Sequence, residues 1–179
     1  MAVDLSRTFK PIGIAVLTIS DTRTAADDTS GDLLCERIKA AGHNLVARAI
    51  EKDDVDRIVN RFRNWLDQRE VDAIVTTGGT GLTGRDVTPA ALDLIRDSTQ
   101  GKDIPGFGEL FRWISYQTIG TSTIQSRAHA VLVRGKYIFA LPGSNGAVKD
   151  GWDGILAEQL DSRNRPCNFV ELMPRLREV

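Results

Sequence analysis

Cysteine is scarce in this chain of 179 residues, which contains only Cys35 and Cys167. The two cysteines lie far apart in the sequence, and neither belongs to a Cys-x-x-Cys pair. This pattern indicates neither a zinc site nor a disulfide framework. We therefore expect two free thiols.

Long apolar segments are also absent. No run approaches the ~18 residues of a membrane-spanning helix, and residues 1–10 lack the apolar stretch of a secretory signal. The sequence therefore predicts a soluble, cytoplasmic protein with no membrane partner.

Positive charge is not in excess, because the chain has 23 Lys and Arg residues and 24 Asp and Glu residues, which gives a net charge of −1. This balance argues against a dedicated binder of nucleic acid or of anionic membranes, so any anion site must be local. The two histidines, His43 and His129, are not at metal-ligand spacing. Neither a P-loop motif nor a G-x-S-x-G nucleophile motif occurs.

Neither repeats nor Pro/Ser-rich linkers divide the chain, so we expect residues 1–179 to form one domain. Short apolar runs alternate with amphipathic segments. Strands are expected over residues 12–20, 45–50, 71–77, 130–133 and 137–141, and helices over 32–41, 55–66, 88–97, 104–117 and 148–160. Residues 120–127 are expected to be a loop or a helix start, and the tail past Asp161 is expected to be irregular. The pattern predicts a three-layer α/β/α sandwich with a mostly parallel sheet and an antiparallel hairpin at its edge.

Glycines are concentrated directly after the third expected strand, with four of them in residues 76–84. Glycine permits positive φ and lets backbone N–H groups converge on an anion, so the segment predicts a phosphate cradle. A flexible turn is the alternative. In parallel sheets ligands bind at the carboxyl ends of strands, which selects residues 20–21, 77–86 and 142–146 and the region of Asp53.

Gly79, Gly81 and Gly84 also satisfy G-x-G-x-x-G. In a dinucleotide site the helix opens directly on the glycines. Here the helix is expected only at Thr88, as its N-cap, with Pro89 in the first position. A Rossmann-like oxidoreductase is therefore the weakest alternative.

Acidic and hydroxyl side chains flank these segments. Asp86 is suited to binding Mg²⁺ or to acting as a general base beside the glycines, but it also suits a helix N-terminus. Asp53 fits either a site or an N-cap, and Ser20 and Asp21 fit either a site or a turn. The residues alone leave these alternatives open.

Several ordered motifs resemble the MoaB/MogA family of molybdenum-cofactor biosynthesis, which includes domains of gephyrin and plant Cnx. The resemblance covers nearly the whole chain, and residues 120–127 and 165–169 are similar to bacterial MoaB in particular. The motifs are Leu17-Thr18-Ile19-Ser20-Asp21, Asp28-Thr29-Ser30-Gly31, Thr76-Thr77-Gly78-Gly79-Thr80-Gly81, Arg85-Asp86-Val87-Thr88-Pro89, Pro105-Gly106-Phe107-Gly108-Glu109 and Pro142-Gly143.

The resemblance implies a homo-oligomer, trimeric or hexameric, that binds molybdopterin, with other cofactor-biosynthesis enzymes as further partners. In the adenylyltransferase members, the terminal phosphate of molybdopterin attacks the α-phosphorus of Mg-ATP and pyrophosphate leaves. The resemblance to these members implies that Asp53 and Asp86 are the catalytic, Mg²⁺-binding carboxylates. The implied substrate-binding residues are Ser20, Asp21, Thr77, Gly78, Gly79, Thr80, Gly81, Pro142, Gly143 and Ser144.

Two features keep a second interpretation open. Ser144-Asn145-Gly146 replaces the P-G-N-P or P-G-Q-P continuation of many MogA-type members. Some bacterial MoaB proteins also keep the fold without adenylyltransferase activity. The alternative is therefore a non-catalytic protein that binds molybdopterin or another pterin.

Overall fold

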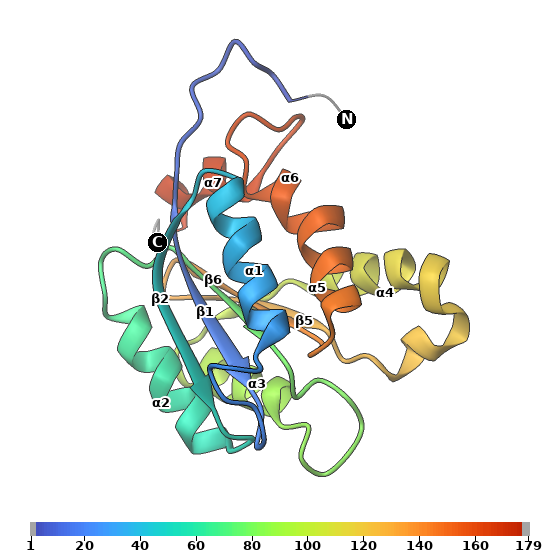
Figure 1. Ribbon diagram of the computed structural model, residues 1–179. Coiled ribbons are helices and arrows are strands. Elements are labelled where there is room, and N and C mark those ends of the chain that lie inside the picture. The colour runs from blue at the N-terminus through green and yellow to red at the C-terminus, as the bar shows by residue number, and fades with distance from the viewer. Residues whose placement is uncertain (1–2, 177–179) are drawn as a thin grey trace.

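The protein is built on a mixed sheet with helices on both faces (Figure 1). The computed structural model describes residues 3–176. The strands run in the order β2 (Asn44–Glu51), β1 (Gly13–Ile19), β3 (Ala73–Thr77), β6 (Lys136–Leu141), β5 (His129–Val133) and β4 (Lys102–Asp103). The first four are parallel to one another, and β5 and β4 are antiparallel to their neighbours.

The helices form the two outer layers. They are α1 (Thr29–Ala40), α2 (Val55–Leu66), α3 (Thr88–Ser98), α4 (Pro105–Ile119), α5 (Asn145–Gly151), α6 (Ala157–Gln159) and α7 (Phe169–Leu172), with 3₁₀ or π turns η1 (Gly120–Gln125), η2 (Trp152–Leu156) and η3 (Met173–Arg175). The side chains of α1, α4 and α5 pack on one face of the sheet, and those of α2 and α3 pack on the other. The predicted three-layer α/β/α sandwich is confirmed.

Successive side chains of a strand point to opposite faces of the sheet, and this alternation gives the protein two separate hydrophobic cores. In β1, Ile14 and Val16 face the α1 side, whereas Ala15, Leu17 and Ile19 face α2. Because the strand is buried on both faces, its sequence is a continuous apolar run and not an alternating one. No helix among residues 3–176 is long and apolar enough to cross a membrane.

The helix starts differ from the predictions. α1 begins at Thr29 and not at Asp32, because the Asp28 carboxylate accepts a hydrogen bond from the Gly31 N–H at 3.1 Å and caps the earlier turn. Thr88 is not the N-cap of α3. It is the first helical residue, and its hydroxyl donates instead to the Gly78 carbonyl at 2.8 Å.

The structure also differs from the predictions at the end of the chain and at the sheet edge. The predicted hairpin of β5 and β6 exists, but β4 pairs outside β5 and takes the edge. Past Asp161 the chain is not wholly irregular, because Asn168 caps α7 through a bond from the Glu171 N–H at 2.9 Å. Both cysteines are free, as predicted.

Candidate functional site

A polar cavity of about 410 Å³ lies at the carboxyl ends of β1, β3 and β6. Parallel strands place their following loops at one edge, so segments distant in sequence meet there. The cavity is lined by Ile19, Ser20, Thr22, Arg23, Asp53, Gly78, Gly79, Thr80, Gly81, Arg85, Asp86, Pro142 and Gly143. Nine of the twelve predicted site residues therefore line one cavity.

The glycines shape the floor of this cavity. Gly78 and Gly79 have φ values of +109° and +63°, which residues other than glycine rarely adopt. A Cβ on Gly78 would lie 2.1 Å from the Ile19 carbonyl oxygen, and one on Gly79 would lie 2.4 Å from the Thr88 hydroxyl. The backbone can therefore approach β1 and α3 this closely only with glycine at both positions, and it is left bare toward the cavity.

Asp53 is 9% exposed and is not the cap of α2. That role belongs to Asp54, whose carboxylate accepts from the Arg57 N–H at 2.9 Å. Burial, and after it the charge of Asp21, raises the pKa of Asp53 above its ordinary value. A hydrogen bond from the Asp21 backbone and the charge of Arg85 act in the opposite direction, but they lower the pKa of Asp53 by less than burial and the Asp21 charge raise it. A carboxylate whose ionisation is opposed by burial and by a neighbouring negative charge is suited to a cation in the same cavity.

Asp86 has the opposite electrostatic environment. Burial opposes its ionisation, but hydrogen bonds from the Thr83 hydroxyl at 2.6 Å and the Thr83 N–H at 2.8 Å outweigh this effect and lower the pKa of Asp86. Its charge also contributes to the raised pKa of Asp53. Two carboxylates that repel each other across one cavity match the donor set of Mg²⁺, which takes one or two carboxylates plus phosphate oxygens.

Arg85 provides positive charge at the mouth of the cavity. Its guanidinium forms a bidentate pair with Asp21, with Nε–Oδ2 and Nη2–Oδ1 distances of 2.7 Å. Asp21 also accepts a hydrogen bond from the Asp53 N–H at 3.3 Å. Asp21 is not among the cavity-lining residues, and its contacts hold Arg85 and the start of α2 in place.

Thr77 and Ser144 also lie outside the lining of this cavity. The Thr77 hydroxyl donates to the Pro142 carbonyl at 3.1 Å and so joins the ends of β3 and β6. Ser144 caps α5 by accepting from the Ala147 N–H at 3.1 Å. Both predicted substrate-binding residues therefore already have structural partners.

Sequence reasoning missed Arg23. Its Nη2 donates to the Gly143 carbonyl at 2.6 Å, and its Nη1 donates to the Ser30 hydroxyl. The side chain thus joins the loop after β1 to α1 and to the loop after β6, and it brings a second guanidinium to the cavity. The only sequence signal was a basic residue in the polar loop that follows the first strand.

A second cavity of about 250 Å³ adjoins the first and shares Thr80, Gly81 and Pro142 with it. Apolar atoms from α4 and α5 form much of its wall, including those of Phe111 and Ala147. The remaining lining residues are Ser115, Thr118, Ile119, Thr123, Gln125, Ser126, Ser144, Gly146 and Asp150. A polar cavity beside a less polar one suits a ligand with a phosphate at one end and a flat ring system at the other.

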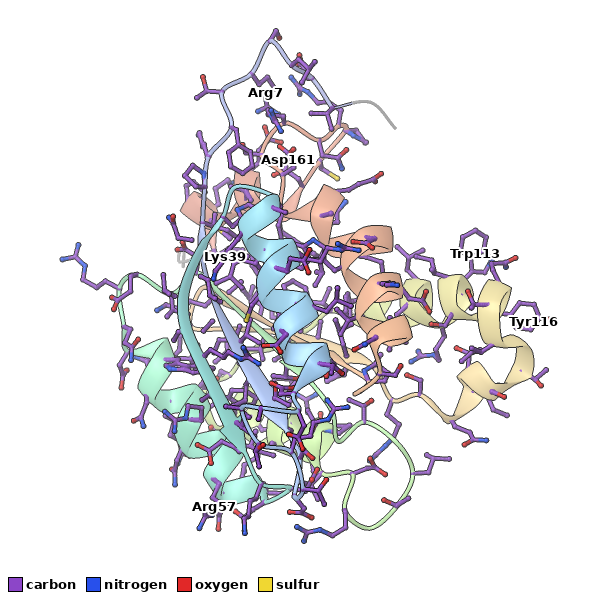
Figure 2. The ribbon with its side chains drawn as sticks, viewed as in Figure 1. Arg7, Lys39, Arg57, Trp113, Tyr116 and Asp161 are labelled. Carbon is purple, nitrogen blue, oxygen red and sulfur yellow. The ribbon has the colours of Figure 1, made fainter. Side chains whose placement is uncertain are left out.

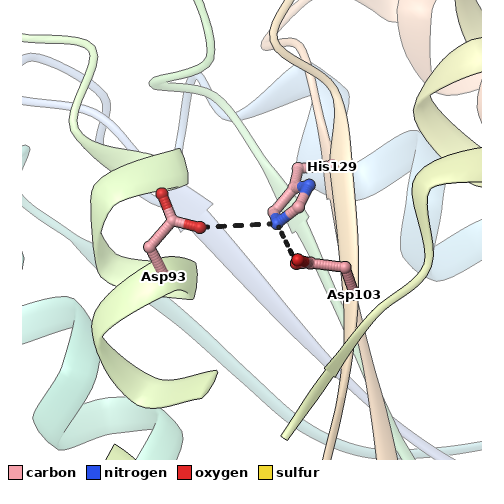
Figure 3. Close-up of side chains that lie close together, drawn as sticks. All are labelled: Asp93, Asp103 and His129. Carbon is pink, nitrogen blue, oxygen red and sulfur yellow. Dashed lines mark ion pairs between the residues drawn. The ribbon is translucent and has the colours of Figure 1, made fainter. Parts of the chain in front are cut away.

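Another cluster of potential metal ligands lies elsewhere, where Asp93, Asp103 and His129 converge to within 4.8 Å (Figure 3). Sequence spacing could not predict this cluster, because the histidine comes from β5 and the aspartates come from α3 and β4. The Nη1 atom of Arg96 already bonds to the facing Oδ1 atoms of Asp93 and Asp103, at 2.8 and 2.6 Å. The cluster is therefore part of an ion-pair network in which Arg96 bridges the two aspartates.

The sheet topology and the paired cavities define an α/β protein with a candidate ligand site at the carboxyl ends of its strands. The helix after β3 begins at Thr88 and not on the glycines, so the arrangement is not a Rossmann dinucleotide site. A sequence model of the family described as "Probable molybdopterin binding domain" matches residues 15–162. The chain belongs to this family, the MoaB/MogA family of molybdenum cofactor biosynthesis.

Individual relatives agree with this assignment. Molybdenum cofactor biosynthesis protein B of Escherichia coli K12 is 44% identical over 165 residues, which cover 92% of this chain and 95% of that protein. The protein of the same name from Bacillus cereus is 42% identical over 152 residues, covering 84% and 88% of the two chains.

Solved structures show the same fold. A crystal structure of a molybdenum cofactor biosynthesis protein B superposes with a TM-score of 0.84 at 37% identity, covering 97% of this chain and 100% of that one. The tungsten cofactor synthesizing protein MoaB from Pyrococcus furiosus superposes with a TM-score of 0.75 at 32% identity, covering 94% and 99% of the two chains.

Proposed function

We propose that this protein binds molybdopterin and transfers adenylate to it from Mg-ATP in the cytoplasm. A phosphate oxygen of molybdopterin attacks the α-phosphorus of ATP, a new P–O bond forms, the α–β bridging bond breaks, and pyrophosphate leaves. The observation that carries the proposal is the convergence of Asp53 and Asp86 on the glycine cradle in one cavity. The substrate phosphate is itself the nucleophile, so the reaction needs no catalytic histidine or cysteine.

Different residues of the polar cavity would bind the metal, stabilise the transferring phosphoryl group and attract the substrates. The carboxylates of Asp53 and Asp86 would hold Mg²⁺, which when bound neutralises charge on the phosphates. The Gly78 N–H already donates to the Leu141 carbonyl at 2.9 Å, and the Gly81 backbone bonds to Asp86, so the N–H groups of Gly79 and Thr80 would stabilise the transferring phosphoryl group. Arg85 and Arg23 add positive charge at the walls, which favours the approach of two polyanionic substrates.

The adjoining cavity supports a site for the pterin ring. It lies between α4 and α5, shares a wall with the glycine segment, and combines apolar atoms with the Ser115–Asp150 hydrogen bond of 2.6 Å. A pterin seated there would direct its phosphate toward Thr80 and Gly81. The alternative, a MoaB-type protein that binds the pterin without turnover, uses the same cavity, so only the reaction separates the two.

The deciding experiment incubates purified protein with molybdopterin and Mg-ATP and follows adenylylated molybdopterin by mass. We expect product together with one equivalent of pyrophosphate. Bound molybdopterin without any product would contradict the transferase and favour the non-catalytic alternative. The matched control omits Mg²⁺ and adds a chelator, which should prevent product formation without preventing binding of the pterin.

Self-association into a trimer or hexamer is the second part of the proposal. Large apolar side chains recur every third residue on α4 and are exposed by 42–65%, namely Leu110, Trp113, Tyr116 and Ile119. Figure 2 shows Trp113 and Tyr116 at the end of the molecule formed by α4, directed away from the sheet. Grouped aromatic residues on a surface are typical of protein interfaces.

We expect Trp113→Glu to shift the protein toward the monomer, because it places a charge where an apolar contact would form. Light scattering after gel filtration measures the mass directly. Leu94→Glu is the control, since Leu94 is also exposed, by 43%, but lies on α3. A wild-type protein that is monomeric at micromolar concentration would contradict the proposal.

A further inference from the structure

The segment from Thr80 to Asp86 carries one of the two site carboxylates but lies mostly in solvent. Leu82 is 67% exposed, and Thr83, Gly84 and Arg85 are exposed as well. Three hydrogen bonds between Thr83 and Asp86 close the segment on itself. The Asp86 N–H donates to the Thr83 carbonyl at 3.0 Å, and the Thr83 N–H and hydroxyl donate to the Asp86 carboxylate at 2.8 and 2.6 Å. An exposed turn of this kind opens readily unless it is tied to the rest of the protein.

The Arg85–Asp21 pair connects the segment through a side chain, and Arg127 connects its backbone. The Arg127 backbone N–H donates to the Thr80 carbonyl at 2.9 Å, its Nε donates to the Gly81 carbonyl at 2.7 Å, and its Nη2 donates to the Asp86 carbonyl. Among residues 3–176 no other side chain donates to a carbonyl oxygen of this segment. One guanidinium therefore spans the two ends of the turn.

The location of Arg127 argues against a direct role in substrate binding. The residue does not line the cavity of Asp53 and Asp86. It lines a different cavity of about 550 Å³, together with Arg112. Its donors are directed to the backbone behind the glycine segment, where a rigid planar fork can hold two carbonyls that a lysine could not reach together.

We propose that Arg127 is a positioning residue that fixes the backbone of residues 80–86 and thereby directs the Asp86 carboxylate into the site. The proposal rests on the proposed function in naming Asp86 as a metal ligand. Arg127 follows η1, and η1 provides Thr123 and Gln125 to the adjoining cavity. The same residue thus joins the wall of the proposed pterin cavity to the carboxylate.

Hydrogen exchange tests the positioning without any catalysis. In Arg127→Met the amides of Thr83 and Asp86 should exchange about tenfold faster, because the loss of charge-assisted hydrogen bonds to two carbonyls corresponds to roughly 1.4 kcal/mol or more. The amides of β3 should be unchanged. Arg112→Met is the matched control, since Arg112 lines the same cavity but donates weakly, at 3.4 Å, to Ser126 and Ala128. Unchanged exchange at Thr83 and Asp86 would overturn the proposal.

The Mg²⁺ dependence of adenylylation gives the second measurement. In Arg127→Lys we expect the Mg²⁺ concentration for half-maximal rate to rise about tenfold, while the KM for molybdopterin and the melting temperature stay close to wild type. An equal rise in Arg112→Lys, or a change confined to the molybdopterin KM, would refute a role through Asp86. If wild-type protein makes no product, the proposed function fails, but the exchange experiment still decides the role of Arg127.

Discussion

Asp86→Asn and Asp53→Asn are expected to reduce the formation of adenylylated molybdopterin by at least ~100-fold, since each removes a full charge from the metal site and metal stabilisation of phosphoryl transfer is worth several kcal/mol. Molybdopterin binding should stay within a few-fold of wild type, because the pterin cavity is not lined by either aspartate. Product is measured by mass, and binding is measured by titration of the pterin fluorescence.

Asp54→Asn is the matched control for Asp53→Asn. Asp54 lies next to Asp53 and caps α2, and asparagine caps a helix about as well as aspartate. The control therefore removes a carboxylate one residue from the site and keeps the fold and the cap. Equal loss of product in Asp54→Asn and Asp53→Asn, or full product in Asp86→Asn, would contradict the assignment of the metal ligands.

The two site variants should differ in stability, which separates chemistry from folding. The pKa of Asp53 is raised in the folded protein, so its ionised form costs stability above its ordinary pKa. Without Mg²⁺ at pH 7, Asp53→Asn should therefore melt at or above the wild-type temperature. The pKa of Asp86 is lowered, so its charge stabilises the fold at neutral pH, and this contribution is lost as the pH falls. Asp86→Asn should melt lower. The opposite order of melting temperatures would contradict the raised pKa assigned to Asp53 and the lowered pKa assigned to Asp86.

The order of strands and helices was readable from the sequence because the central strands are buried on both faces. β1 and β3 have only buried side chains, and such runs differ clearly from the amphipathic pattern of α2. The edge strand β4 was not readable. It consists of Lys102 and Asp103, both exposed, and it exists only through pairing with Leu132 and Val131 of β5.

The parts of the candidate site that depend on local backbone chemistry could be predicted from the sequence. Clustered glycines after a strand predicted the cradle, and the aspartates beside it were named. Which of two adjacent aspartates caps α2 was not readable, because either carboxylate could satisfy the first free N–H groups and only packing leaves Asp53 for the cavity. Arg127 was also out of reach, since the contact with Asp86 spans 41 positions and involves the side chain of one residue and the backbone of the other.

Gly79→Val is expected to weaken the binding of Mg-ATP by at least ~100-fold, the largest effect on ligand binding that we predict for a single position. Gly79 has a φ of +63°, which a β-branched residue adopts only with strain of about 1–3 kcal/mol. Its Cβ would lie 2.4 Å from the Thr88 hydroxyl and 3.0 Å from Asp53 Oδ1, so the added atoms would displace α3 or the site carboxylate. Either movement disrupts the row of N–H groups that would hold the phosphates.

Gly84→Val is the control for this substitution, because a Cβ at Gly84 meets nothing within 4 Å and its φ lies outside the left-handed region. Gly79→Ala provides a milder variant in case valine prevents folding. Alanine keeps the positive-φ strain and the contact with Thr88 but adds no branch, so its binding should lie between those of wild type and Gly79→Val. Calorimetric titration with Mg-ATP measures all three, with circular dichroism to establish that each is folded. A folded Gly79→Val protein that binds Mg-ATP as tightly as Gly84→Val would show that the phosphates lie elsewhere, since valine at this position cannot be accommodated without moving α3 or Asp53.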